Sequence, residues 1–162
     1  MRISVTFFTT ALITLVASIA SEASAAVSTY TPAQACTPWT STDAQNMSFS
    51  ALAGAFANST SIGATIVCPI NVSGGSTLIG TNAFVCDNNS TALFTITACS
   101  FDPNNSNNWS CGLNVTSSGN CQTLSVPLGG VNTYFFRILK VILPAKDATN
   151  GFSLFQGYST TI

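Results

Sequence analysis

Residues 91–99, Thr91-Ala-Leu-Phe-Thr-Ile-Thr-Ala-Cys99, carry the plainest secondary-structure signal in the chain. Phe94, Ile96 and Ala98 alternate with threonines and with Cys99. Strict alternation that is rich in β-branched side chains is typical of a strand with one buried face. The preceding Asp87-Asn-Asn-Ser90 is rich in residues that form turns, so it predicts a turn before the strand.

The same pattern continues along the chain as short apolar stretches separated by Gly, Asn and Ser clusters. Residues 62–70 alternate in the same way, and residues 132–143 are apolar on both faces, which predicts a strand in the centre of a sandwich. Residues 47–57 fit either a strand or a short helix. We therefore predict an all-β domain at residues 46–162, a single antiparallel β-sandwich of about 7–8 strands. Its other strands are expected at residues 77–86, 109–115, 122–128 and 152–161.

The first part of the chain, residues 1–25, is typical of a secretory signal peptide. Arg2 precedes an apolar run at residues 3–20, and Ala23-Ser-Ala25 forms a small-x-small cleavage signature. The alternative is an uncleaved membrane anchor, but Ser and Thr interrupt the run. We expect a secreted protein, in the extracellular space, the periplasm or at the cell surface, without a transmembrane anchor after cleavage. Residues 26–45 are polar and are predicted to be an irregular N-terminal segment.

Six cysteines follow the signal peptide, which predicts disulfide stabilisation in an oxidising compartment. Short paired spacings of the kind that bind zinc are absent from the sequence. The sequence leaves the pairing open; we favour Cys111 with Cys121, because both flank a turn-like stretch at residues 115–120. The candidate disulfide residues are Cys36, Cys68, Cys86, Cys99, Cys111 and Cys121. Residues 122–162 lack cysteine, so strand pairing and packing must hold them.

Charge is scarce in this chain, at 6% of the residues, and histidine is absent. The lack of histidine excludes Ser/His/Asp and Cys/His catalytic arrangements and histidine metal ligands. Four Lys and Arg residues are too few for a nucleic-acid interface. A surface of Ser, Thr, Asn and Gly with little charge repels its neighbours weakly, which favours self-association or attachment to a cell-surface glycan or protein.

Two oxygen-rich loops are candidates for chemistry. Asp87 with Asn88, and Asp102 with Asn104, offer carboxylate and amide oxygens of the kind that bind calcium. The competing interpretation is that these side chains hydrogen-bond their own backbone in turns. We expect no other cofactor. Asp87 and Asp102 both follow strand ends, so they are also the candidate pair for carboxylate-assisted hydrolysis. Nothing in the sequence tunes them for it, and we predict that the protein is not an enzyme.

Trp109 is the best candidate for ligand binding, together with Asp102 and Asn104. An indole offers a flat apolar face to a sugar ring, and the Asn-rich loop beside it could hold the sugar hydroxyls. The competing interpretation is an ordinary core tryptophan at the start of a strand. The other aromatic residues considered for such a face are Trp39, Tyr30, Tyr134 and Tyr158.

A series of short motifs runs along the chain after the signal peptide: Asn58, Val67-Cys-Pro-Ile70, Phe84-Val-Cys-Asp-Asn88, Ala98-Cys99, Tyr134, Ile142-Leu-Pro144 and Gly157-Tyr158. Together they resemble a loose pattern in small exported bacterial proteins of uncharacterised function, and the resemblance covers most of the chain after the signal peptide. That family is expected to have another cysteine a few residues before the late proline, where this chain has Lys140 or Val141. Against the pattern, Cys86, Cys111 and Cys121 look additional, and the resemblance implies no activity and no site residue.

The leading hypothesis from the sequence is a non-catalytic secreted or cell-surface protein with a structural or interaction role. It rests on export, disulfides, sparse charge and the missing catalytic groups. One alternative is a carbohydrate-binding module that uses Trp109. A second alternative is a secreted hydrolase or a hydrolase inhibitor.

Overall fold

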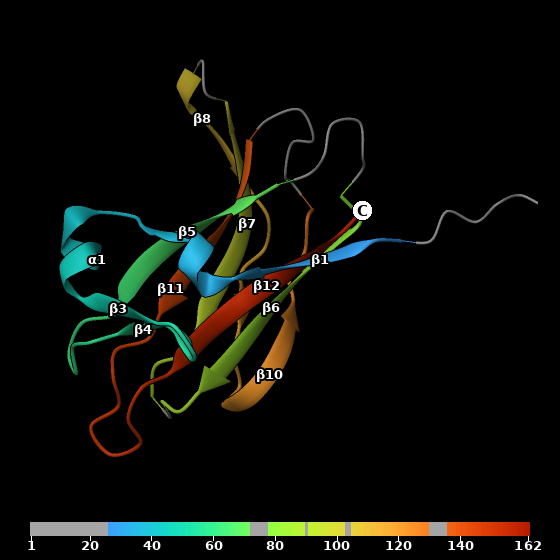
Figure 1. Cartoon of the computed structure of the whole chain (residues 1–162). Coiled ribbons are helices and arrows are strands. Elements are labelled where there is room, and N and C mark those ends of the chain that lie inside the picture. Colours follow the sequence, from blue (N-terminus) through green and yellow to red (C-terminus); the bar gives the residue numbers. More distant parts are fainter. Residues whose placement is uncertain (1–25, 72–77, 90, 103–104, 130–135) are drawn as a thin grey trace, which may run out of the picture.

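Two antiparallel sheets packed face to face make up the protein (Figure 1). The structure is a computed structural model, and it describes residues 26–71, 78–89, 91–102, 105–129 and 136–162. Twelve strands lie in this part of the chain, six in each sheet. The prediction of an all-β sandwich is confirmed. The expected signal peptide, Asn104 and Tyr134 lie outside the described residues.

The first sheet, sheet A, has the strand order β10-β6-β12-β4-β3. β1 also belongs to this sheet, because it pairs with residues 157–161 of β12, beyond the place where β4 pairs with β12 at Phe155. Its strands are β1 (Ser28–Pro32), β3 (Met47–Ser50), β4 (Gly54–Ala57), β6 (Gly80–Asp87), β10 (Asn120–Ser125) and β12 (Leu154–Thr161).

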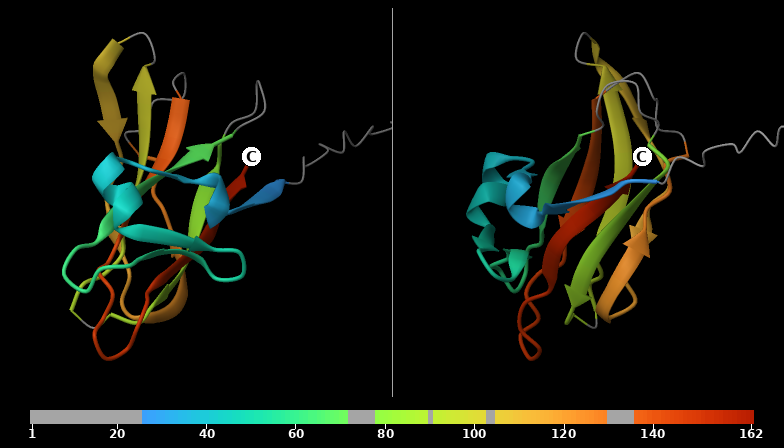
Figure 2. Two further views of the ribbon diagram at one scale, coloured as in Figure 1. Left: turned by 60° about the vertical axis from the view of Figure 1, so that its left-hand side comes forward. Right: turned by 45° about the vertical axis from the view of Figure 1, so that its right-hand side comes forward.

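The second sheet, sheet B, has the order β2-β5-β11-β7-β8, and β9 pairs with β7 beyond β8. Figure 2 shows the β7–β8 hairpin projecting from one end of the sandwich, and the connection before β12 projecting from the other. The strands of sheet B are β2 (Thr37–Pro38), β5 (Ala64–Ile70), β7 (Thr95–Asp102), β8 (Asn105–Cys111), β9 (Val115–Thr116) and β11 (Phe136–Leu143).

The cysteine-free end of the chain supplies the middle strand of each sheet. β11 lies between β5 and β7, and β12 pairs with β6 on one side and with β1 and β4 on the other. The prediction of a central strand is confirmed for Phe136–Leu143. Because both neighbours hydrogen-bond to these strands, pairing and packing hold this region without a disulfide.

The core lies between the two sheets and follows the alternation that the sequence showed. Phe94, Ile96 and Ala98 are fully buried, as expected for the inner face of β7 and the residue that precedes it. Facing strands supply the other large buried side chains, which include Ile66, Val85, Leu139, Val141, Leu143, Phe155 and Tyr158.

Three disulfides join Cys36 to Cys68, Cys86 to Cys121, and Cys99 to Cys111. The favoured pairing of Cys111 with Cys121 is therefore wrong. The reason is that Cys111 ends β8 in sheet B, whereas Cys121 lies in β10 of sheet A, so the turn between them carries the chain from one sheet to the other. Cys86 and Cys121 are register partners in sheet A, as Cys99 and Cys111 are in sheet B.

The N-terminal segment, residues 26–45, is more ordered than the sequence indicated. It contains β1, a 3-10 turn at Ala33–Ala35, β2 and the short helix α1 (Ser41–Gln45). The side chains of Thr40 and Asp43 form a capping box at the start of α1. Sequence patterns missed β1 because it is polar and its partner β12 lies at the other end of the chain.

The stretch at residues 47–57 is two strands joined by a turn, not one strand or a short helix. Gly54 begins the second of these strands with φ of 106°, which favours glycine. A β-carbon at this position would lie 2.1 Å from the carbonyl oxygen of Phe155. The glycine thus lets β4 approach β12 closely, which completes sheet A.

A partly buried hydrogen bond joins one sheet to the other. Tyr158 lies in β12 and is 1% exposed, and its hydroxyl donates to the backbone carbonyl of Pro69 in β5. Burial raises the pKa of the Tyr158 hydroxyl, and a hydrogen bond with Thr31 partly lowers it. The phenol is therefore held in its neutral form, as a donor, between the sheets.

Tyr158→Phe should lower the free energy of unfolding by about 1 kcal/mol, because the carbonyl of Pro69 loses its donor in the core. Urea unfolding followed by circular dichroism checks this. The matched control is Tyr30→Phe, which removes an exposed hydroxyl that donates to the carbonyl of Gln156. Equal effects of the two variants would contradict a special role for the cross-sheet bond.

Alkaline pH should destabilise the wild type more than Tyr158→Phe. The folded state raises the pKa of Tyr158 above its ordinary value of 10.0, so the unfolded chain releases this proton first. Stability from this group is complete below about pH 10 and falls as the pH rises further. Urea midpoints between about pH 8 and pH 11.5 measure the slope. A wild-type slope no steeper than that of Tyr158→Phe would refute this account.

Candidate functional site

Four aromatic side chains gather on the outer face of sheet B. We call Trp39, Phe101, Trp109 and Phe136 the aromatic cluster. Every one of them contacts another member ring to ring. The exposed fractions are 44% for Trp39, 42% for Trp109 and 64% for Phe136, so the cluster is a surface feature. The competing interpretation of Trp109 as a core residue is wrong.

Strand register brings three members of the cluster into one row. Phe136 on β11 is the register partner of Phe101 on β7, which in turn is the partner of Trp109 on β8. The ring centroids of Phe136 and Phe101 lie 5.7 Å apart and those of Phe101 and Trp109 5.1 Å apart, with planes inclined by 23° and 24°. Such cross-strand neighbours on one face stabilise a sheet and here form a continuous apolar strip.

Trp39 joins this row from the opposite edge of the sheet. It directly follows β2, at one end of the strand order, whereas Trp109 lies in β8 at the other end. Their ring centroids are nevertheless 5.6 Å apart, with the planes at 77°. The two indoles must therefore reach toward each other across the outer face of sheet B.

One cation lies beside the cluster. The Nζ atom of Lys140, on the central strand β11, lies 5.8 Å from the ring centroid of Trp39. Asp102 directly follows Phe101 in β7. The carboxylate of Asp43 is held by the backbone N–H of Thr65 and by the N–H and hydroxyl of Thr40, so it supports the start of α1 and its contact with β5.

The structure tests the proposed ligand-binding residues in part. Trp109 and Asp102 do lie at the same end of the β7–β8 hairpin, while Asn104 is outside the described residues. Sequence reasoning missed Phe101 and Phe136. Both stand at outward positions of strands whose inward residues fill the core, and that alternation was the signal that could have found them.

Two of the tyrosines that the sequence grouped with Trp109 lie elsewhere, and the third, Tyr134, is outside the described residues. Tyr158 is buried between the sheets. Tyr30 belongs to β1 in sheet A, where its ring contacts Phe84 and its hydroxyl lies 2.8 Å from where a β-carbon of Gly157 would be. Tyr30 therefore covers a glycine of its own sheet, sheet A, and lies away from the aromatic cluster on sheet B.

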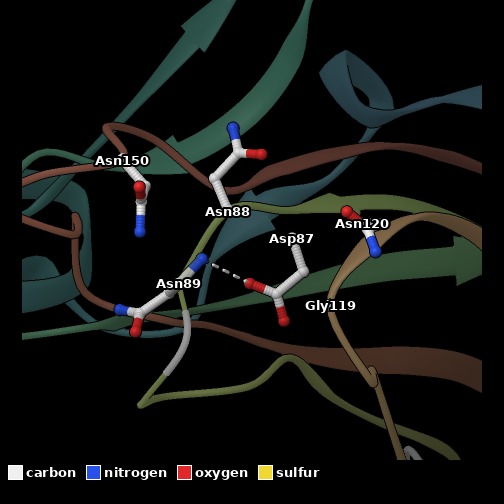
Figure 3. A pocket seen from close by; sticks show the side chains of 6 residues that line it. All are labelled: Asp87, Asn88, Asn89, Gly119, Asn120 and Asn150. Atoms are coloured by element: carbon white, nitrogen blue, oxygen red, sulfur yellow. Dashed lines mark hydrogen bonds between the residues drawn. The ribbon is translucent and has the colours of Figure 1, made fainter.

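A polar hollow lies at the far end of the sandwich from the β7–β8 tip (Figure 3). Its volume is about 430 Å³, and it opens between the ends of β6 and β10 and the connection before β12. Asp87 is its only carboxylate, and the other lining residues are Asn88, Asn89, Gly119, Asn120 and Asn150.

Internal hydrogen bonds occupy the carboxylate of Asp87, which is 3% exposed. One oxygen accepts from the hydroxyl of Ser153 at 2.8 Å and from the backbone N–H of Asn89 at 3.0 Å. The other accepts from the hydroxyl of Ser117. The side-chain oxygen of Asn89 in turn accepts from the backbone N–H groups of Thr91 and Ala92. The interpretation that these side chains support turns is confirmed here.

Asp87 and Asp102 do not form a pair. Asp87 ends β6, whereas Asp102 ends the next long strand, β7, which runs the other way. Seven residue steps along β7 span about 23 Å, far more than the ~5–10 Å of paired catalytic carboxylates. The two candidate carboxylates are therefore not brought together as paired acids, because the chain crosses from sheet A to sheet B between them. In the described part of the chain, no three His, Cys, Asp or Glu side chains gather as metal ligands would.

Comparison with known proteins found no match for this chain among protein-family models, curated proteins or solved structures. Within the described residues, none of the helices has the length and apolar character needed to cross a bilayer.

Asp87→Asn should lower the free energy of unfolding by about 1–3 kcal/mol, because the two serine hydroxyls donate to different carboxylate oxygens and the amide NH2 that replaces one of these oxygens cannot accept. Thermal and urea unfolding measure the loss. Asn150→Ala, an exposed substitution in the same hollow, serves as the control and should change stability by less than about 0.5 kcal/mol. Unchanged stability of Asp87→Asn would show that this network does not hold the loops.

Proposed function

We propose that this chain is a non-catalytic extracellular recognition protein that binds carbohydrate through the aromatic cluster. One observation carries the proposal. The chain has two tryptophans, and they meet over the outer face of sheet B from opposite edges of the sheet while each stays more than two-fifths exposed. Exposed apolar clusters of this kind mark binding surfaces.

The chemistry of the cluster favours a sugar over other ligands. The C–H faces of a sugar ring pack on aromatic rings, and its hydroxyls need donors and acceptors at the rim. Lys140 is a donor beside Trp39, and Asp102, which follows Phe101 in β7, is the carboxylate nearest to the cluster in sequence. Asn114, whose side chain bonds the outward-facing Thr97 on β7, adds an amide.

A binding role without catalysis fits the remaining groups. The chain has no histidine, and Asp87 and Asp102 lie at opposite ends of the sandwich. Asp87 is also occupied by Ser117 and Ser153. The three disulfides favour an oxidising location, which supports secretion after removal of the predicted signal peptide.

A second copy of the chain is the competing occupant of the aromatic cluster. Sparse charge favours association, and a structural role in an assembly was the leading hypothesis from the sequence. Sugar binding has the stronger support because polar acceptors and a donor border the rings. The two occupants differ in one measurable respect: self-association depends on protein concentration, and sugar binding depends on ligand concentration.

Titration of soluble and insoluble polysaccharides should change the tryptophan emission, since both tryptophans lie in the cluster. Trp109→Ala and Trp39→Ala should each weaken binding of the best polysaccharide at least about tenfold. Phe49→Ala, which removes an exposed aromatic ring from β3 of sheet A, should leave the affinity unchanged.

A flat glycan-array response with constant tryptophan emission would overturn carbohydrate binding. Emission that shifts with protein concentration alone, together with larger species on size-exclusion chromatography, would assign the cluster to a second copy instead.

A further inference from the structure

We infer that two of the three disulfides, Cys36–Cys68 and Cys99–Cys111, position Trp39 and Trp109 so that the two indoles of the aromatic cluster meet. The third disulfide, Cys86–Cys121, has no such role. The consequence for sugar binding rests on the proposed function, but the placement of the indoles does not. The binding surface would then exist in the oxidised protein only.

Trp109 depends on the register of an edge strand. β8 ends the strand order of sheet B, so β7 alone holds it. The register between these strands shifts just beyond the Phe101–Trp109 pair, between Phe101 and Asp102. Two residues on the other side of Trp109, Cys111 is bonded to its register partner Cys99. A slip of one residue would turn Trp109 to the opposite face, and the disulfide prevents it.

Trp39 depends on the other edge. β2 has only two residues, Thr37 and Pro38, and Trp39 follows them. Cys36 immediately precedes β2 and is bonded to Cys68 in β5, and both cysteines are buried, at 3% and 0% exposure. Beyond the strand, the backbone N–H of Trp39 donates to the carbonyl of Thr65 at 2.9 Å. So short a strand pairs weakly, and the disulfide fixes where it begins.

The third disulfide is a natural control. Cys86–Cys121 joins β6 to β10 in sheet A, on the other side of the core from the aromatic cluster. Like Cys99–Cys111, it links register partners on neighbouring strands and includes one exposed cysteine. It spans 35 residues, against 32 for Cys36–Cys68 and 12 for Cys99–Cys111, so its removal should cost at least as much chain constraint as removal of either, without moving either indole.

The indole pair provides a readout that needs no ligand. Trp39 and Trp109 are the two tryptophans of the chain, and their rings lie 5.6 Å apart at 77°. Two indoles this close, with inclined planes, couple their electronic transitions and give paired far-ultraviolet dichroism bands of opposite sign. Trp39→Phe must abolish the pair of bands, which assigns the signal.

Three double variants test the inference: Cys36→Ala with Cys68→Ala, Cys99→Ala with Cys111→Ala, and Cys86→Ala with Cys121→Ala as the control. The first two should lose the coupled bands and weaken binding of the best polysaccharide at least about tenfold. The control should keep the bands and an affinity within about twofold of wild type. Buried-methyl resonances in NMR spectra verify that each variant is folded.

Mild reduction of the wild type covers the case in which a variant fails to fold. Cys111 is exposed, whereas Cys36 and Cys68 are buried. Of the two disulfides in sheet B, Cys99–Cys111 should therefore be reduced before Cys36–Cys68 while the protein is still folded. Alkylation, separation and peptide mapping identify each reduced species. Coupled bands that persist in a folded species without Cys99–Cys111 would overturn the inference. Bands that vanish as expected, in a protein that binds no polysaccharide, would support the inference and refute the proposed function.

Discussion

Contact between the two sheets is what the whole structure depends on. No disulfide joins one sheet to the other: Cys86–Cys121 and Cys99–Cys111 link neighbouring strands of one sheet, and Cys36–Cys68 links β5 to the residue just before β2 in the same sheet. Buried side chains and the Tyr158–Pro69 hydrogen bond hold the two sheets together. Large side chains such as Phe94 and Phe155 fill the space between them. At about 25 cal/mol per Å² of buried apolar surface, this layer is the dominant favourable contribution to folding. The disulfides act beside it, by keeping edge strands in register.

The polar hollow at one end of the sandwich and the aromatic cluster on sheet B differ in how far their own neighbours satisfy them. At one end, the carboxylate of Asp87 gathers Ser117 and Ser153 from segments far apart in the sequence. This network satisfies its own members, and it explains why a hollow rich in asparagine need not hold an ion. The outer face of sheet B is different, because the aromatic cluster leaves large apolar rings in contact with solvent. The exposed rings, rather than the polar hollow, are therefore the feature on which the proposed binding function rests.

Local alternation predicted what local pattern can specify. Residues 91–99 and the central strand at Phe136–Leu143 were found because one face or both faces of each are apolar. The disulfide pairing was not, because Cys111 and Cys121 lie in different sheets although only ten positions apart. The sequence named two members of the aromatic cluster, Trp109 and Trp39, but it did not show that they meet and it missed Phe101 and Phe136. The row in the cluster comes from register across three strands, and Trp39 arrives from a polar segment whose partners are distant in sequence.

The position of β11 and β12 in the sequence also bears on how the protein folds. The strands that stand in the middle of both sheets are the last two to be synthesised. Without them, β1 lacks the strand that it pairs with, and β5 is paired only at the two residues that face β2. Both sheets are therefore completed by pairing between segments far apart in the sequence. Contacts between such distant segments make folding slow.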